Sequence, residues 1–140
     1  LVDMILGLKM YDVFKEYDSY IREKYHAEPG YITMNMPALL DALEKVGISN
    51  PIICFSMNKI GFRMAGGLEI NEKYLNEKTF RPIAMQVLAA GALNPREAFE
   101  YIGQFPTIEG VLFGSSSKNH IRENIDLISS TLSVKESAEF

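Results

Sequence analysis

The chain has 140 residues, of which 47% are hydrophobic and 23% are charged, and its formal net charge is −4. This length predicts one domain that buries roughly two thirds of its unfolded surface, and the composition is that of an ordinary globular protein. The negative charge argues against a nucleic-acid partner, because a nucleic-acid-binding surface needs a stripe of basic residues.

The cysteine and histidine content bears on disulfide bonds, cellular location and metal binding. A single cysteine, Cys54, excludes an internal disulfide, so we expect a cytoplasmic location. Two distant histidines and this cysteine give no metal-ligand spacing, so no metal site is expected. No apolar run approaches the roughly 20 residues that cross a bilayer, and no signal peptide is visible, so no membrane partner is expected.

The first half of the chain predicts a helix followed by alternating strands and helices. Residues 1–8 are apolar and fit either the end of a strand or the start of a helix. Apolar residues then recur at helical spacing over residues 10–26, and Pro29-Gly30 stops the helix. The elements that follow are expected at 31–34 (strand), 35–46 (helix, capped by Asn35) and 51–55 (strand).

The second half continues the alternation after a long connection. Residues 56–77 exceed the usual loop length and include a short helix-like stretch, and long loops are often functional. In the last expected helix, Ile121, Ile125 and Ile128 are predicted to form the buried stripe. The expected elements are 71–75 (helix), 82–88 (strand), 94–102 (helix, capped by Asn94), 110–113 (strand) and 119–130 (helix). Residues 1–132 are expected to form the domain and residues 133–140 a frayed tail.

Strands that alternate with helices predict an α/β fold, with a parallel sheet covered by helices. The expected strands start about 20 to 30 residues apart, as in the (β/α)8 barrel, so these four βα units correspond to half of a TIM-type barrel. A half barrel leaves two open edges and one exposed inner face. The chain is therefore a fragment of a longer chain, or a homo-oligomer that closes the sheet, or an open doubly wound sheet like a flavodoxin.

Two glycine-containing turns are the strongest candidates for a ligand site. One contains Gly91, and the other runs from Gly114 through Ser115, Ser116 and Ser117 into the last helix. In (β/α)8 barrels the turns after the last two strands commonly hold phosphate, and the start of a helix favours an anion. We therefore expect a phosphorylated ligand here, with the alternative that the glycines only form turns.

Four further polar side chains follow the second and third strands, where parallel sheets carry their active sites. Lys59, if buried, could form a Schiff base, although exposed lysines are more common. Arg63 could clamp a carboxylate or phosphate. Gln86 stands in an apolar strand and must reach a partner or a pocket. Asn58 completes the set of candidate ligand-binding residues, and none of the four assigns a reaction.

Residues 85–99 and 111–124 resemble the C-terminal half of an aldo-keto reductase-type barrel. The earlier part of the chain resembles this family only by pattern. The resemblance implies that NADP is held by the turn and helix after the last strand. By position, Ser115 and Ser116 would face phosphate, and Glu123 and Asn124 the adenine.

The sequence departs from the family pattern at two positions of the cofactor-binding segment. The family often has Lys where Gly114 stands and Arg where His120 stands, and both grip the 2′-phosphate of NADP. The family's catalytic Asp, Tyr, Lys and His belong to the other half of the barrel. Three functions follow: an oxidoreductase-like enzyme or part of one, a non-catalytic binding domain, and an assembly module that pairs through open sheet edges.

Overall fold

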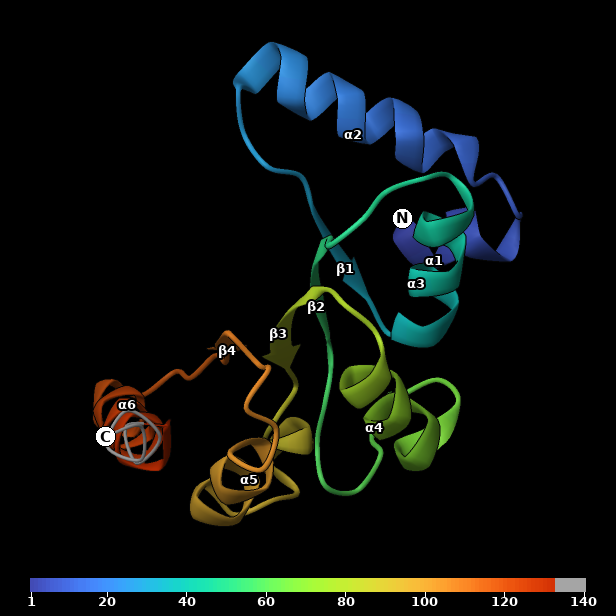
Figure 1. Ribbon diagram of the computed structural model, residues 1–140. Coiled ribbons are helices and arrows are strands. Elements are labelled where there is room, and N and C mark those ends of the chain that lie inside the picture. The colour runs from blue at the N-terminus through green and yellow to red at the C-terminus, as the bar shows by residue number, and fades with distance from the viewer. Residues whose placement is uncertain (133–140) are drawn as a thin grey trace, which may run out of the picture.

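Within the described residues, four parallel strands form one sheet in the order β1-β2-β3-β4. They are β1 (Gly30–Thr33), β2 (Ile52–Ser56), β3 (Arg81–Met85) and β4 (Gly110–Leu112). The structure is a computed structural model that describes residues 1–132 (Figure 1). The predicted α/β class with a parallel sheet is confirmed. A doubly wound sheet reverses its strand order, so the sequential order excludes that alternative for the described residues.

In the part of the chain that the structure describes, six α-helices and one 3-10 turn connect and flank these strands. They are α1 (Val2–Gly7), α2 (Asp12–Tyr25), α3 (Met36–Lys45), α4 (Gly67–Glu77), η1 (Ala89–Gly91), α5 (Pro95–Ile102) and α6 (Lys118–Leu132). The predicted N-caps of α3 and α5 are confirmed. The side chain of Asn35 accepts a hydrogen bond from the amide of Ala38, and that of Asn94 accepts one from the amide of Arg96.

Residues 1–8, for which the sequence left two alternatives, form a helix rather than a strand end. Two elements shift by three or more residues, and α4 begins at Gly67 rather than at residue 71. β3 ends at Met85, three residues before the predicted end, because Gln86 adopts a left-handed backbone with φ of 56°. The apolar run continues past this point because Val87 is buried in the turn rather than in the strand.

The two faces of the sheet have different environments. Tyr31, Phe55 and Ala84 are at most 2% exposed and pack into the core with the helices. Because side chains alternate along a strand, Ile32 and Leu112 lie on the opposite face, where they are 60% and 53% exposed. We call this uncovered side the open face. Cys54 lies on it at the centre of the sheet, between Ile32 and Ile83, and is 8% exposed.

The buried stripe of α6 differs from the predicted one. Ile128 is half-buried and packs against the core as predicted, but Ile121 and Ile125 are exposed. Asn124 is buried and Leu127 is half-buried instead. The reason is that α6 packs against α5, where Thr131 approaches Gly103 closely. Because α6 packs against α5, its buried side is rotated by about one residue from the side that would be buried if α6 lay directly on β4.

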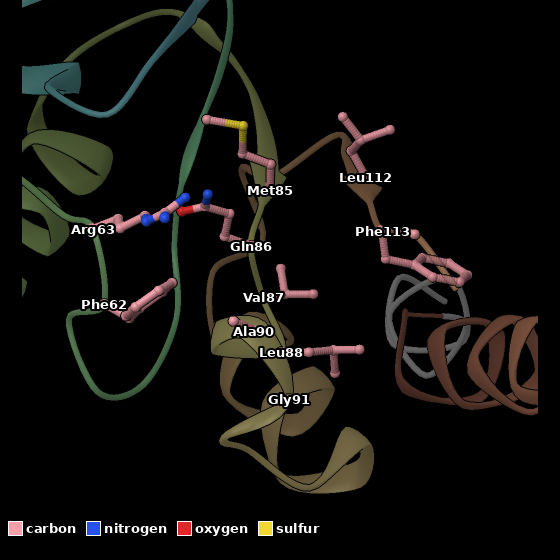
Figure 2. A pocket seen from close by; sticks show the side chains of 11 residues that line it. Phe62, Arg63, Met85, Gln86, Val87, Leu88, Ala90, Gly91, Leu112 and Phe113 are labelled. Atoms are coloured by element: carbon pink, nitrogen blue, oxygen red, sulfur yellow. The ribbon is translucent and has the colours of Figure 1, made fainter. Parts of the chain in front are cut away.

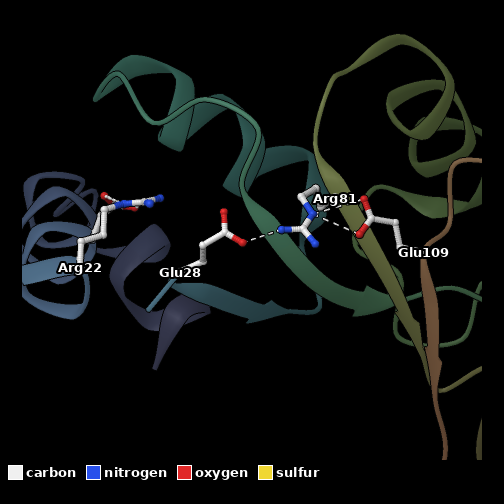
Figure 3. A network of polar contacts seen from close by, with 5 residues as sticks. Arg22, Glu28, Arg81 and Glu109 are labelled. Carbon is white, nitrogen blue, oxygen red and sulfur yellow. Dashed lines mark hydrogen bonds and ion pairs between the residues drawn. The ribbon is translucent and has the colours of Figure 1, made fainter. Parts of the chain in front are cut away.

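A network of charged side chains lies at the amino end of the open face (Figure 3). Arg81, in β3, donates from Nη1 to Glu28 Oε2 at 2.7 Å and from Nε to Glu109 Oε2 at 3.1 Å. Glu28 precedes β1 and Glu109 precedes β4. One guanidinium therefore connects the segments that enter both outer strands, and the bonds to Glu109 and Glu28 raise the pKa of Arg81. This end of the sheet is opposite the one that carries the candidate site.

Candidate functional site

A cleft of about 690 Å³ lies at the carboxyl ends of β3 and β4 (Figure 2). Three segments form it: the loop after β2, the turn after β3, and the end of β4. Its volume falls within the range of roughly 300–1,000 Å³ that is typical of small-molecule sites. The carboxyl ends of parallel strands are where α/β folds bind ligands, so this cleft is the candidate functional site.

The loop after β2 is held by one buried amide. Asn58 is fully buried; its Oδ1 accepts from the Phe62 amide at 2.8 Å, and its Nδ2 donates to the Phe62 carbonyl at 2.9 Å. The Asn58 amide N–H in turn contacts Met64 Sδ at 3.4 Å. Both side-chain groups of Asn58 are occupied by this loop, so the residue supports the cleft from below rather than lining it.

This support places Arg63 at the rim of the cleft. The side chain is exposed, and its guanidinium carbon lies 5.2 Å from the centroid of the Phe62 ring. Among residues 1–132, no carboxylate forms an ion pair with it. Figure 2 shows the guanidinium extending from the loop toward Gln86. The positive charge at this rim is therefore available to an anionic ligand.

Gln86 brings a second polar group to the same place. Its Oε1 accepts a hydrogen bond from Ser56 Oγ at 2.9 Å. This bond satisfies the expectation that a glutamine in an apolar run needs a partner. With the amide held in this orientation, the Nε2 hydrogens remain for a ligand. Arg63 and Gln86 together present a cation and an amide donor to one point, an arrangement that suits a phosphate or carboxylate.

The turn after β3 has an unusual backbone. Gln86, Ala89, Ala90 and Gly91 all have positive φ, from 47° to 88°. Non-glycine residues in the left-handed region cost on the order of 1–3 kcal/mol each, and such strain gathers at functional sites. Hydrogen bonds from the Ala89 amide to the Gln86 carbonyl and from the Gly91 amide to the Leu88 carbonyl, both 2.9 Å, hold the turn. The sequence contains no signal for left-handed alanines, because pattern analysis expects glycine or asparagine there.

The turn after β4 contributes Gly114 to the rim, but its three serines lie beyond the lining of the cleft. Ser115 Oγ accepts from the Ser117 amide at 3.2 Å, and the Ser117 carbonyl accepts from the Ile121 amide at 3.0 Å. Ser116 is exposed. Ser115 and Ser117 therefore take part in the local turn that starts α6. Of the nine predicted site residues, the structure brings Arg63, Gln86, Gly91 and Gly114 together around the cleft.

Lys59 lies outside this group. Its ammonium forms an ion pair with Glu97, at the start of α5, and about half of each side chain is exposed. The buried environment that a Schiff-base lysine needs is therefore absent. The resemblance placed Glu123 and Asn124 at an adenine; Glu123 is exposed, whereas Asn124 is buried on the side of α6 that faces the fold.

The apolar walls of the cleft were not predicted as site residues. Phe62, Leu88, Leu112 and Phe113 provide most of them. The alternation within β4 could have placed Leu112 on the face opposite Val111. For Phe62 the sequence carries no such signal, since its position depends on the hydrogen bonds of Asn58.

In the described part of the chain, residues 1–132, no group of three or more His, Cys, Asp or Glu side chains is arranged to hold a metal ion. None of the helices in this part of the chain has the length and hydropathy required to cross a membrane. The chain matches no protein-family model, no curated protein and no solved structure.

Proposed function

We propose that the protein is a ligand-binding half of a (β/α)8-type barrel, and that the cleft binds a small phosphorylated molecule or a nucleotide. The observation that carries this proposal is the convergence of Arg63 and Gln86 between the turns at Gly91 and Gly114. Charge-assisted hydrogen bonds to a guanidinium are strong and geometrically specific, so Arg63 would provide most of the recognition of the anion.

The shape of the cleft supports a ligand with an apolar or planar body. Phe62, Leu88 and Phe113 form apolar walls beside the polar rim. Small-molecule sites commonly combine such walls with a few polar groups that fix the orientation of the ligand. A nucleotide, which has a planar base, would cover more of these apolar walls than a sugar phosphate. The resemblance to aldo-keto reductases makes NADP one candidate among the nucleotides, but Gly114 and His120 replace the residues that grip its 2′-phosphate in that family.

The sheet topology supports the half-barrel interpretation. The strands are parallel and each one neighbours the next in the chain, which is the order found in (β/α)8 barrels. One face of the sheet packs against helices, while the other retains exposed apolar side chains at Ile32 and Leu112. In a closed barrel this second face would be the interior.

The lining of the cleft favours binding over complete catalysis. Among the lining residues of the described chain, Arg63 is the one whose side chain is titratable. General acid–base chemistry requires a group that exchanges a proton near the operating pH, and an arginine does not. The domain would therefore act either as a non-catalytic binding domain or as the ligand-holding part of an oxidoreductase-like enzyme whose reacting groups lie elsewhere.

Thermal unfolding with inorganic phosphate, NADP or a sugar phosphate tests the proposal. A ligand at 100 times its Kd stabilises the folded state by about 2.7 kcal/mol, which raises Tm by several degrees. We expect Arg63→Met to abolish the shift. Lys59→Met should retain it, because Lys59 pairs with Glu97 outside the cleft. If no anion raises Tm, or if Arg63→Met responds like the original protein, the site is not an anion site.

A second candidate function is assembly. The open face exposes Ile32 and Leu112, and isolated sheet edges are templates for further strands. Exposed apolar side chains on an uncovered sheet face are a feature of interaction sites. This function does not exclude ligand binding, because the cleft lies at the end of the sheet and the open face along its length.

A further inference from the structure

The outer edge of β1 borders an apolar groove of about 430 Å³ between this strand and the helices α1 and α2. Val2, Ile5, Phe14 and Tyr31 contribute to its walls. The hydroxyl of Tyr31 is buried and has no hydrogen-bond partner among the described residues, and burial raises its pKa. A groove beside a strand edge provides space for an extended segment that adds one strand to the sheet.

The backbone of β1 is suited to this addition at its centre. The Gly30 carbonyl accepts from the Tyr17 hydroxyl at 3.2 Å, and the Met34 amide donates to Asp3 at 3.1 Å. Both groups point away from β2. Because alternate residues of a strand direct their amide and carbonyl to the same side, those of Ile32 also face the outer edge. Two side-chain contacts thus hold the ends of this edge and leave its middle for a new strand.

The opposite edge has the complementary feature. Figure 1 shows α6 lying beyond β4, at the end of the sheet opposite β1. α6 packs against α5 and leaves Ile121 and Ile125 exposed. In a repeating βα barrel, a helix that follows a strand covers the junction with the next strand. The position of α6 therefore matches a sheet that continues past β4.

We propose that a second copy of this chain closes the sheet, with β4 of each copy pairing in parallel with β1 of the other. A single two-fold axis satisfies both edges at once and gives eight parallel strands, the number found in closed βα barrels. In β4, Val111 points to the helix side and Leu112 to the open face. Val111 would then enter the groove beside Tyr31 of the second copy, and Leu112 would contact its Ile32. This inference rests on the half-barrel arrangement but not on the anion site.

The partner of matching size and strand direction is another copy of the same half. All four described strands run in the same direction, so β4 of one copy and β1 of the other can pair in parallel. Ile32 and Leu112, which lie beside these two edges, are 60% and 53% exposed, so a neighbouring strand can bury them.

Closure would also complete the candidate site. The cleft is bounded by β3 and β4 and opens toward the free edge of β4. A neighbouring β1 from the second copy would bring its Met34 and Asn35, at the carboxyl end of that strand, beside the rim formed by Gly114. Each cleft would then lie at an interface, and ligand binding and association would be coupled.

Light scattering and sedimentation of the full chain between about 1 and 100 µM test the inference. We expect about twice the mass of 15.8 kDa at the higher concentrations. Ile32→Lys, on the open face, should weaken association at least tenfold without changing the circular dichroism. Ile70→Lys is the matched control, because Ile70 is a similarly exposed isoleucine in α4, away from the open face. A monomer throughout, or a dimer that Ile32→Lys leaves intact, would overturn the proposal.

A cross-link identifies the paired strands. In a Cys54→Ser background, chains that carry Ile32→Cys are mixed with chains that carry Leu112→Cys and treated with a short bismaleimide. We expect cross-linked dimers in the mixture and few in either chain alone. Efficient cross-linking of the Ile32→Cys chain with itself would place β1 against β1 and reject this arrangement. Association without a phosphate-induced Tm shift would contradict the anion site alone, and the reverse result would contradict the closure alone.

Discussion

The position of Arg63 depends on Asn58, which holds the backbone of the preceding residue, Phe62. Asn58, fully buried, satisfies both the amide and the carbonyl of Phe62, and Arg63 follows with φ of 53°. At the scale of single residues, the cleft therefore combines an exposed charged residue, Arg63, with a buried residue that holds the loop, Asn58. The two should respond differently to substitution, since one contacts the ligand and the other holds the backbone.

Asn58→Ala should lower the free energy of unfolding by about 1–3 kcal/mol, because two backbone groups of Phe62 lose their partners in a buried position. It should also weaken any anion-induced stabilisation, since the loop that carries Arg63 loosens. Urea denaturation measures the first effect and thermal shift with phosphate the second. Asn76→Ala, at an exposed position of α4, should stay within about 0.5 kcal/mol. Equal effects of the two substitutions would mean that Asn58 does not organise the loop.

Gly114→Val should reduce anion binding in the cleft without changing the stability of the fold. A Cβ added at Gly114 meets no heavy atom within 4 Å, and its φ is outside the left-handed region. We therefore expect little change in Tm without ligand and a lower affinity for the anion, because the branched side chain enters the rim. Gly91 has φ of 88°, so the same change there would strain the backbone. An unchanged affinity in Gly114→Val would remove this turn from the site.

At the scale of elements, a side-chain hydrogen bond joins α4 and α5. The hydroxyl of Tyr101 donates to Glu72 Oε1 at 2.7 Å, and the Tyr101 ring packs edge-to-face with Phe105. Burial first, and the Glu72 carboxylate second, raise the pKa of Tyr101. The two helices that flank β3 therefore share a contact that depends on the protonated form of a phenol.

Tyr101→Phe should cost about 1.5 kcal/mol at pH 8, the size of a hydrogen bond to a charged group. The unfolded chain releases the Tyr101 proton above a pH of about 10, while the folded state keeps it. The stabilisation is therefore complete below that pH and decreases as the pH rises above it. Chemical denaturation at pH 8 and pH 10.5 should show a smaller loss of stability with pH for Tyr101→Phe than for the original chain. Parallel losses in both would show that Tyr101 ionises equally in the two states.

Elements were easier to predict than the site because they depend on local pattern. The N-caps at Asn35 and Asn94 combine an asparagine with a following proline, and this local chemistry suffices to start a helix. The buried stripe of α6 was predicted correctly only at Ile128, because the packing of α6 against α5 is a tertiary contact that the local pattern does not show. In the site, Arg63 was recognisable as a polar residue in the loop after a strand, and Gln86 as a polar residue within an apolar strand. Phe62 was not, because the sequence does not show which loop residues Asn58 will hold.

At the scale of the whole molecule, the bridge from Arg81 to Glu28 and Glu109 fixes the amino end of the sheet. These side chains are partly exposed, so salt should screen their attraction. We expect Arg81→Met to lower stability at low ionic strength and to differ less from the original chain at 1 M salt. Lys73→Met is the control, because Lys73 forms a long 4.0 Å pair with Glu77 within one helix. A difference that persists in high salt would mean that Arg81 acts mainly through packing.

The single thiol of the chain offers a built-in reporter of whether the sheet is covered. Cys54 stands in the middle of the open face, and burial raises its pKa, so little of the reactive thiolate is present near neutral pH. If two copies enclose this face, alkylation of Cys54 should be slow in concentrated samples and should accelerate on dilution. If the face is always uncovered, the rate should not depend on protein concentration. The unmodified protein can thus reveal its own state of association through the chemistry of one sulfur atom.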